Sequence, residues 1–348
     1  MKKIIAVIGA RPQFIKHFPI EQASKDKLEL ITIHTGQHYD KNMSQVFFDQ
    51  LRMKKPDYML SLGGGSHGEQ TGKMLIEIEK ILLEEKPEAV LVYGDTNSTL
   101  AGSLAASKLN LKVIHIEAGL RSYNRLMPEE INRILTDQIS SLLLVPNDHA
   151  LQNLEKENVN NNVFIVGDVM KDMVRIAKTR IGEGRNKNLQ EPYYYATLHR
   201  PYNVDKKERL QYILDSISEL ANKVIFAAHP RTLKMIEAFE LNLNKSKIEI
   251  ISPQGYFENL IYLSNAKALI TDSGGMQKEA YWLQKKCITI RSETEWTETT
   301  HDGANILLFN DLTDIKNHID SPIMNWNEDL YGDGRSAEKI VELIKAHL

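Results

Sequence analysis

The stretch TDSGGMQKEA, residues 271–280, indicates both a fold and a ligand. The mostly apolar run 266–270 before it is typical of a buried strand, and residues 281–283 after it continue as a helix. A strand, a Ser-Gly-Gly turn and a helix together suit a phosphate, because glycine lets the backbone approach closely and the first helical turn presents free N–H groups. Glu279 lies about one turn further on, where its carboxylate could accept hydrogen bonds from two ribose hydroxyls. The stretch predicts a nucleotide diphosphate on the second half of the chain.

Length and composition limit the class of protein. The 348 residues are enough for two domains of ordinary size. Charged residues make up 26% and hydrophobic residues 42%, as in soluble globular proteins. The formal net charge of -3 gives no general attraction to nucleic acid or to a membrane surface, so neither is expected as a partner. Local cations and helix N-termini must then neutralise a polyanionic ligand.

The single cysteine, Cys287, excludes a disulfide framework and a thiolate metal cluster. It lies in an apolar β-like run, which predicts an inert buried thiol. No His/Asp/Glu spacing resembles a metal site, and HExxH is absent, so no metal ion is expected. No apolar run approaches the ~20 residues that span a bilayer. The chain begins with a strand rather than a signal peptide, and we expect a cytoplasmic protein.

Short β-like runs alternate with helix-length segments along the chain. Many runs are apolar throughout, as expected for parallel strands covered on both faces. A first series of predicted strands covers 3–8, 28–34, 89–93, 112–116, 142–145 and 163–166, and a second covers 193–197, 223–227, 248–251, 266–270, 286–290 and 304–308. The helix-length segments include 68–85, 98–107, 129–138, 206–220 and 336–347.

This alternation predicts an α/β fold with two doubly wound, Rossmann-like domains. The N-terminal domain is expected over 1–170 and the C-terminal domain over 171–335. The last helix, 336–348, has no following strand and is a candidate to pack back on the first domain. Because ligands of open α/β sheets bind beyond the carboxyl ends of the strands, two such domains facing each other would enclose a ligand cleft.

Two acidic residues directly follow predicted strands of the first domain. Asp95 could cap the next helix, but Asn97 or Ser98 could do so equally well, which leaves Asp95 available for chemistry. Glu117 lies at the mouth of an apolar strand, where a carboxylate is costly unless it is paired or used. Arg121 is a possible structural partner for it, so a purely structural role stays open.

A third acidic residue, Glu129, opens a helix and shares one face with Asn132 and Arg133. Ordinary capping and a surface ion pair would explain this pattern equally well. Together with Asp95 and Glu117, however, it would suit proton transfer at carbon. Burial could raise the pKa of one carboxyl while an arginine keeps another ionised.

Cations and histidines also follow predicted strands. Arg11 and Lys16 lie just after the first strand, in a loop that is neither a Walker A motif nor GxGxxG. His199 and His229 each come after an apolar strand and next to an arginine, as expected of diphosphate contacts. The alternatives are a capped helix with surface cations and solvated loops with hydrogen-bonded histidines.

Seven segments in this order resemble the non-hydrolysing UDP-N-acetylglucosamine 2-epimerases over essentially the whole chain: GARPQFIK (9–16), TGQH (35–38), YGDTNST (93–99), HIEAGLRS (115–122), PEEINR (128–133), HPR (229–231) and TDSGGMQKEA (271–280). The resemblance implies a glycosyltransferase-B-type fold with the active site between two Rossmann-like domains. It implies reversible inversion at C2 of a UDP-linked 2-acetamido sugar, through elimination of UDP to a 2-acetamidoglucal and re-addition. No cofactor is implied, and the partners implied are the UDP-linked amino sugar and a second copy of the chain.

The resemblance also implies roles for single residues. Acid/base roles fall on Asp95, Glu117 and Glu129. Substrate or UDP contacts, taken from the resemblance together with the motifs above, fall on Arg11, Lys16, Arg133, His199, His229, Gln254, Ser273, Gly274, Gly275 and Glu279.

Two departures from the family pattern bear on the substrate. Many UDP-N-acetylglucosamine epimerases read GTRPE where this chain has GARPQ at 9–13. They read TERPE where it has TEWTE at 294–298, so Trp296 replaces a substrate-side arginine. These segments are similar to the branch acting on UDP-2,3-diacetamido-2,3-dideoxy-glucuronate. The substrate is therefore either UDP-N-acetylglucosamine or that uronate. A hydrolysing epimerase, a retaining glycosyltransferase of the same fold and a non-catalytic nucleotide-sugar-binding protein stay open as alternatives.

Overall fold

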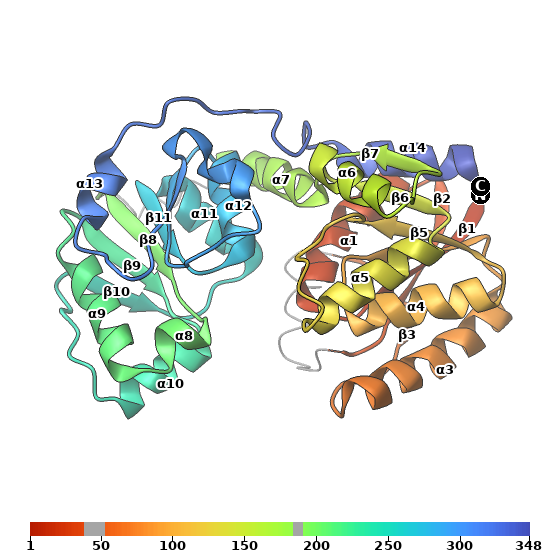
Figure 1. Ribbon diagram of the computed structural model, residues 1–348, viewed down its shortest axis with the longest axis horizontal. Coiled ribbons are helices and arrows are strands. Elements are labelled where there is room, and N and C mark those ends of the chain that lie inside the picture. The colour runs from red at the N-terminus through yellow and green to blue at the C-terminus, as the bar shows by residue number, and fades with distance from the viewer. Residues whose placement is uncertain (38–52, 184–190) are drawn as a thin grey trace. The chain divides into compact units, whose positions relative to one another are not determined.

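The computed structural model of the protein describes residues 1–37, 53–183 and 191–348 (Figure 1). The chain forms two compact units. Unit 1 contains Met1–Met173 and Tyr331–Leu348, and unit 2 contains Val174–Leu330. Each unit has one parallel β-sheet with helices packed on it (Figure 1). The predicted α/β class with two parallel-sheet domains is therefore confirmed.

The sheet of unit 1 has the strand order β3-β2-β1-β4-β5-β6-β7, and every pairing is parallel. Its order changes direction between β1 and β4, where ligands of such sheets bind beyond the strand ends. The central strands are the most buried, since helices cover both faces: β4 and β6 are buried at every residue, and β1 and β5 at all but their first residues. The strands are β1 (Lys2–Ile8), β2 (Leu28–His34), β3 (Tyr58–Met59), β4 (Ala89–Tyr93), β5 (Lys112–Ile116), β6 (Leu142–Val145) and β7 (Val163–Ile165).

The helices of unit 1 pack on this sheet through buried aliphatic side chains. They are α1 (Arg11–Ser24), α3 (His67–Glu85), α4 (Asn97–Lys108), α5 (Pro128–Ile139), α6 (Asp148–Lys156), the start of α7 (Val169–Glu183) and α14 (Ser336–His347). The cap of α4 is Thr96, whose side chain accepts from the Thr99 N–H, and not Asn97 or Ser98. Asp95 is therefore not the N-cap of α4.

The last helix, α14, belongs to unit 1 and packs against α1. Its first turn is held by the buried carboxylate of Asp172, which accepts from Ser336 N at 3.0 Å and Ala337 N at 2.9 Å. A carboxylate on the free N–H groups of a helix start is favoured by hydrogen bonding and by the helix dipole.

The sheet of unit 2 has the parallel order β10-β9-β8-β11-β12-β13. Its strands are β8 (Tyr193–Thr197), β9 (Lys223–Ala227), β10 (Ile248–Ile251), β11 (Ala268–Thr271), β12 (Lys286–Thr289) and β13 (Asn305–Leu307). The helices are α8 (Pro201–Val204), α9 (Lys207–Ser218), α10 (Pro230–Ala238), α11 (Tyr256–Asn265), α12 (Gly274–Trp282), η1 (Thr297–Gly303) and α13 (Ile315–Asp320). Buried aliphatic side chains from both faces of the sheet form its core.

One local prediction at β11 is wrong. Helix α12 begins at Gly274 with Ser273 as its N-cap, so the two glycines open the helix and do not form a turn before it. Neither glycine has a positive φ. Within the described ranges, no helix has both the length and the apolar character needed to cross a bilayer.

Candidate active site

A lysine and a glutamate form an ion pair at the carboxyl ends of β1 and β5. Lys16 Nζ, from the second turn of α1, contacts Glu117 Oε2, and each side chain is 13% exposed. Gly94, at the end of β4, has a φ of +60°, and a Cβ atom added there would lie 3.1 Å from Glu117 Oε2. Burial alone would lower the pKa of Lys16, but the charge and hydrogen bond of Glu117 raise it above its usual value.

Glu117 has a left-handed backbone, with a φ of +70°. Such a conformation costs a non-glycine residue roughly 1–2 kcal/mol and persists only where its surroundings hold it. Two backbone groups, Glu117 N and Ala118 N, donate to Leu144 O at 3.0 and 3.2 Å. The suggested structural partner, Arg121, instead bonds Asp137 and Glu157. The cation beside Glu117 is Lys16, for which the sequence predicts only a substrate contact.

The second carboxylate, Asp95, lies directly after β4 and has its own cation. Arg133 Nη2, from α5, is 2.5 Å from Asp95 Oδ2, and Arg133 Nη1 is 2.9 Å from Glu130 Oε2. Asn132 Nδ2 donates to the Asp95 carbonyl oxygen at 2.9 Å. Burial would lower the pKa of Arg133, but its two carboxylate partners raise it. One helix turn therefore fixes both the backbone and the side chain of Asp95.

The two acids that open α5 lie in different surroundings. Glu129 is exposed in the first turn of α5. Glu130 is 1% exposed and accepts from Ser122 N, Ser122 Oγ and Tyr123 N at 2.8–3.0 Å. Burial would raise the pKa of Glu130, but these hydrogen bonds and Arg133 lower it. Glu130, which the sequence analysis did not single out, ties the loop before α5 to the helix.

A buried glutamine, Gln13, connects the loop after β1 to the end of β4. Its Oε1 accepts from Gly9 N at 2.8 Å and Ala10 N at 3.0 Å, and its Nε2 donates to Tyr93 O at 2.9 Å. A glutamate could not donate to that carbonyl unless it were protonated. In the sequence, only the replacement of the glutamate of GTRPE by Gln13 pointed to a special role for this residue. Arg11, two residues earlier, is exposed at the start of α1.

In unit 2, hydrogen-bond donors gather around the start of α12. A Cβ atom added at Gly274 would lie 3.6 Å from both Arg291 Nη1 and Trp296 Nε1 and 3.8 Å from Glu295 Oε2, whereas one added at Gly275 would meet nothing within 4 Å. Ser273 is the N-cap and makes no side-chain cap bond. Open space next to free N–H groups at a helix start suits an anion.

Trp296 belongs to this group of donors. Its ring lies against Lys278, whose Nζ is 3.7 Å from the ring centroid, within the range of a cation–π contact. Its backbone N donates to Thr294 Oγ1 at 3.1 Å. The neighbouring Arg291 and Glu295 form a two-bonded ion pair at 3.0 and 2.9 Å. The indole is thus held firmly beside Gly274.

The two predicted histidines lie together at the ends of β8 and β9. The ring centroids of His199 and His229 are 5.9 Å apart. His199 Nδ1 is 3.0 Å from Asp272 Oδ1, and Asp272 also accepts from the backbone N–H groups of His199 and Arg200. His229 caps α10 and is exposed.

Asp272 is fully buried and connects the turn after β8 to the start of α12. Burial would raise the pKa of Asp272, but the hydrogen bonds and charge of His199 lower it, with help from Arg200 N and Asn203. It lies inside the stretch 271–280, yet nothing in that stretch indicated a partner that follows another strand.

Two other residues predicted to bind UDP, Glu279 and Gln254, do not take part in these contacts. Glu279 is buried further along α12, and Gln254 follows β10, where its amide donates to Ser252 O at 2.6 Å.

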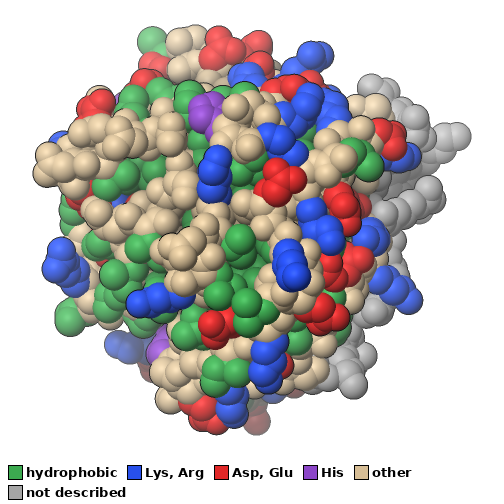
Figure 2. All heavy atoms as spheres, turned by 90° about the vertical axis from the view of Figure 1, so that its right-hand side faces the viewer, with side chains coloured by type: hydrophobic (Ala, Val, Ile, Leu, Met, Phe, Trp, Pro, Cys, Tyr) green, Lys and Arg blue, Asp and Glu red, His purple; other side chains and the backbone are tan. Residues whose placement is uncertain are grey.

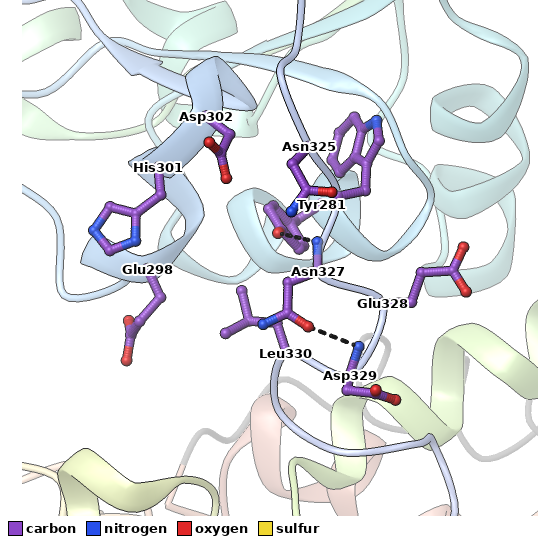
Figure 3. Close-up of a pocket in the computed structure, with 10 residues that line it drawn as sticks. Tyr281, Glu298, His301, Asp302, Asn325, Asn327, Glu328, Asp329 and Leu330 are labelled. Atoms are coloured by element: carbon purple, nitrogen blue, oxygen red, sulfur yellow. Dashed lines mark hydrogen bonds between the residues drawn. The ribbon is translucent and has the colours of Figure 1, made fainter.

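A pocket of about 580 Å³ in unit 2 holds none of the predicted site residues (Figure 3). Its wall includes four carboxylates and one histidine, so it disfavours a diphosphate. Tyr281, from the last turn of α12, bonds Asn327 N at 2.9 Å. The lining residues are Tyr281, Glu298, His301, Asp302, Asn325, Trp326, Asn327, Glu328, Asp329 and Leu330.

Comparison with known proteins identifies the family. The model of the UDP-N-acetylglucosamine 2-epimerase family matches residues 21–345. The chain belongs to this family. A UDP-N-acetylglucosamine 2-epimerase homolog of Methanococcus maripaludis is 49% identical, with 99% of each chain covered. The UDP-2,3-diacetamido-2,3-dideoxy-D-glucuronate 2-epimerase of Pseudomonas aeruginosa is 44% identical over 98% of this chain and 99% of its own.

Solved structures of the epimerase family share the fold. The crystal structure of Methanocaldococcus jannaschii UDP-GlcNAc 2-epimerase in complex with UDP-GlcNAc and UDP is similar, with a TM-score of 0.86 and 44% identity. The match covers 99% of this chain and 100% of that chain. The predicted family and the predicted enzyme class are thus confirmed.

Proposed function

We propose that this epimerase-family protein reversibly inverts C2 of a UDP-linked 2-acetamido sugar without hydrolysing it. The observation that carries the proposal is the pair Asp95 and Glu117, at the ends of the neighbouring strands β4 and β5, each beside its own cation. Inversion needs one carboxylate to take a proton from one face of C2 and another carboxyl group to return a proton to the opposite face.

The reaction proceeds in two halves. One carboxylate removes the C2 proton, the bond between C1 and the UDP oxygen breaks, and a C1–C2 double bond forms in the resulting 2-acetamidoglucal. The reverse half adds UDP back to C1 while a carboxylic acid protonates C2 from the other face. No carbonyl adjoins C2, so its hydrogen is only weakly acidic and the departure of UDP must be assisted. Donors that meet the charge developing on the diphosphate supply this assistance.

We assign the residues as follows. Asp95 and Glu117 handle the protons, and Glu129 takes part as a third acid. Arg11, Lys16 and Arg133 contact the substrate from unit 1. The residues of unit 2 that bind UDP are His199, His229, Gln254, Ser273, Gly274, Gly275 and Glu279.

The sugar itself is one of two candidates. A homolog named for UDP-N-acetylglucosamine is 49% identical to this chain and the relative named for the diacetamido-glucuronate is 44% identical, a difference too small to choose between the two sugars. Trp296 in place of a family arginine favours the uronate.

Heavy water tests the reaction and the substrate together. Each UDP-sugar is offered alone in D₂O, and NMR follows C2. We expect deuterium at C2 and a mixture of epimers, faster with the true substrate. Release of free sugar and UDP would instead indicate a hydrolysing enzyme. Exchange that requires an added acceptor would indicate a glycosyltransferase. Binding of UDP without any exchange would remove the enzymatic proposal.

The active form is proposed to be a homodimer. Large apolar side chains on unit 1 are exposed, among them Ile76 (54%) and Leu83 (57%) on α3 and Ile131 and Leu135 (each 46%) on α5. Figure 2 shows hydrophobic side chains grouped between charged ones on one face of the molecule. Such groups support a protein–protein contact. Light scattering should give twice the chain mass of 39.7 kDa, and Ile131→Glu with Leu135→Glu should give one chain mass.

A further inference from the structure

Asp137, on α5, is a fully buried carboxylate for which the proposed chemistry has no use. It accepts three hydrogen bonds from the segment that follows β5 and from β5 itself. The donors are His115 Nδ1 at 2.7 Å, Gly119 N at 3.1 Å and Arg121 Nη1 at 2.7 Å. A buried carboxylate is tolerated only with such partners. Asp137 therefore holds β5 and the following turn against α5.

His115 extends this contact to the neighbouring strand. It is fully buried on β5, and its Nε2 is 2.8 Å from the Gly94 carbonyl oxygen. A carbonyl oxygen only accepts, so Nε2 carries a hydrogen. Burial would raise the pKa of Asp137, but the charges of His115 and Arg121 lower it, so the carboxylate is an ionised acceptor. The ring of His115 therefore joins Asp137 to the turn after β4.

The two turns joined in this way carry the two proposed acids. Gly94 immediately precedes Asp95 and has a φ of +60°. Glu117, with a φ of +70°, precedes Gly119, whose N–H is bound by Asp137. The left-handed backbone of Glu117, a non-glycine residue, needs support from outside its turn, whereas glycine at 94 adopts its positive φ at little cost. His115 supports the first turn and Asp137 supports the second.

Helix α5 acts on the same two turns from one face. Arg133 and Asp137 are four residues apart and so lie on one side of the helix. Arg133 holds the Asp95 carboxylate, while Asp137 holds His115 and the Glu117 turn. We infer that the buried Asp137–His115 pair is a positioning device that fixes the carboxylates of Asp95 and Glu117 relative to each other. This inference rests on the proposed function for its catalytic consequence, but not for the coupling of the two turns.

The test compares Asp137→Asn, His115→Asn and His115→Gln with a control, Glu157→Gln. An asparagine at 115 can keep the donor toward Asp137 but cannot reach Gly94 O, and a glutamine can keep the donor toward Gly94 O. Glu157 binds only the outer side of Arg121 and leaves the contacts of Asp137 intact. Displacing a reacting group by about 1 Å can cost on the order of 100-fold, so we expect kcat per folded molecule to fall about 10- to 100-fold in the first three variants. KM and the Kd for UDP should stay within about twofold, and the control should stay near wild type.

Hydrogen exchange measured by mass spectrometry gives a readout that needs no activity. Asp137→Asn should speed exchange in both segments, 93–97 and 115–121, while peptides of unit 2 keep their protection. His115→Asn should speed exchange mainly in 93–97. Unchanged kcat per folded molecule together with unchanged exchange in these segments would overturn the inference. If Asp137→Asn does not fold, the two His115 variants decide by the same measures. If the wild-type protein labels neither UDP-sugar, the proposed reaction fails, whereas hydrogen exchange still decides whether the pair couples the turns.

Discussion

Unit 1 and unit 2 bring polar groups to the carboxyl ends of their sheets in different ways. In unit 1 the carboxylates of Asp95 and Glu117 are each paired with a cation from the same unit. In unit 2 the start of α12 offers backbone N–H groups next to open space at Gly275. The first arrangement has its charges already satisfied and its geometry fixed. The second leaves donors directed at a place that an anion can occupy.

The difference fits the two tasks proposed for the units. Proton transfer depends on an exact donor–acceptor geometry, and side chains hold that geometry only when other groups fix their orientation. Anion binding at a helix start depends mainly on the backbone, whose position the fold already sets. Changes in unit 1 should therefore affect kcat, and changes in unit 2 should affect the affinity for UDP.

The largest effect should come from Asp95→Asn. The amide cannot take up a proton, so the exchange of deuterium into C2 should fall about 1,000-fold or more, within the range of acid–base catalysis. The Kd for UDP, measured by titration calorimetry, should change by less than about twofold, because UDP is assigned to unit 2.

Two matched variants in the first turn of α5 serve as controls for this result. Glu130→Gln removes a buried carboxylate with four hydrogen bonds and should lower the melting temperature. Glu129→Gln, on an exposed side chain, should leave stability unchanged and tests only the proposed third acid. Normal turnover in Asp95→Asn would remove Asp95 from the mechanism.

The next largest effect is a loss of stability of unit 1 at acid pH, which should distinguish unit 1 from unit 2. Burial lowers the pKa of His17 in unit 1 from 6.5 to about 4. Below pH 6.5 the unfolded chain takes up a proton that the folded chain does not, so unit 1 loses stability as the pH falls from 6.5 toward 4. The loss from this one group is about 3 kcal/mol, and the contribution is fully present above pH 6.5.

The three tryptophans, Trp282, Trp296 and Trp326, all lie in unit 2 and report on it alone. Circular dichroism should show an acid transition of unit 1 while tryptophan fluorescence changes little. His17→Gln should reduce the pH dependence even if it lowers stability at neutral pH, and His34, whose pKa burial also lowers to about 4, should account for the rest. An acid transition seen first by tryptophan would reverse the expected order of the units.

The sequence predicts most of the fold because strands and helices are local patterns. Every run predicted as a strand matches an observed strand to within two residues at each end. The strand that was missed, β3 (Tyr58–Met59), has only two residues and forms by pairing with β2, which no local pattern reveals. The start of α12 was misplaced because a Gly-Gly pair is typical of a turn but is equally compatible with the first turn of a helix.

The site is less predictable, because partners come from distant segments. The motifs indicated Asp95, Glu117, Lys16 and Arg133 but did not pair Lys16 with Glu117. They also could not tell which of Glu129 and Glu130 is buried, since both open the same helix and only the loop at Ser122 and Tyr123 decides. Gln13 and Asp272 were missed for the same reason. Gln13 donates a hydrogen bond to the end of β4, and Asp272 accepts one from the turn after β8. Such contacts exist only in the folded sheet.

A smaller effect, on UDP affinity, should follow from Gly275→Val in unit 2. A Cβ atom added there would meet nothing within 4 Å in the protein, so the fold should tolerate the small valine side chain. It would, however, fill the space proposed for the diphosphate. We expect the Kd for UDP to rise about 10- to 50-fold, which corresponds to about 2 kcal/mol.

Gly72→Val on α3 is the matched control for this variant. Gly72 is also a helical glycine whose added Cβ would meet nothing within 4 Å. The control should show the same small change in stability and no change in UDP binding. Equal UDP affinity in both variants would place the diphosphate away from the start of α12.

The smallest effect should come from Trp296→Phe, which keeps an aromatic ring against Lys278 but removes the indole N–H beside Gly274. One hydrogen bond contributes about 1 kcal/mol, so KM for the UDP-sugar should rise about fivefold while kcat stays nearly constant. Trp326→Phe, next to Tyr281 in the acidic pocket, is the matched control and should leave both constants unchanged. If Trp296 selects the sugar, the rise in KM will differ between UDP-N-acetylglucosamine and the diacetamido-uronate. A fall in kcat with constant KM would instead assign Trp296 to the chemical step. The proposed separation of proton transfer in unit 1 from UDP binding in unit 2 would then fail at this residue.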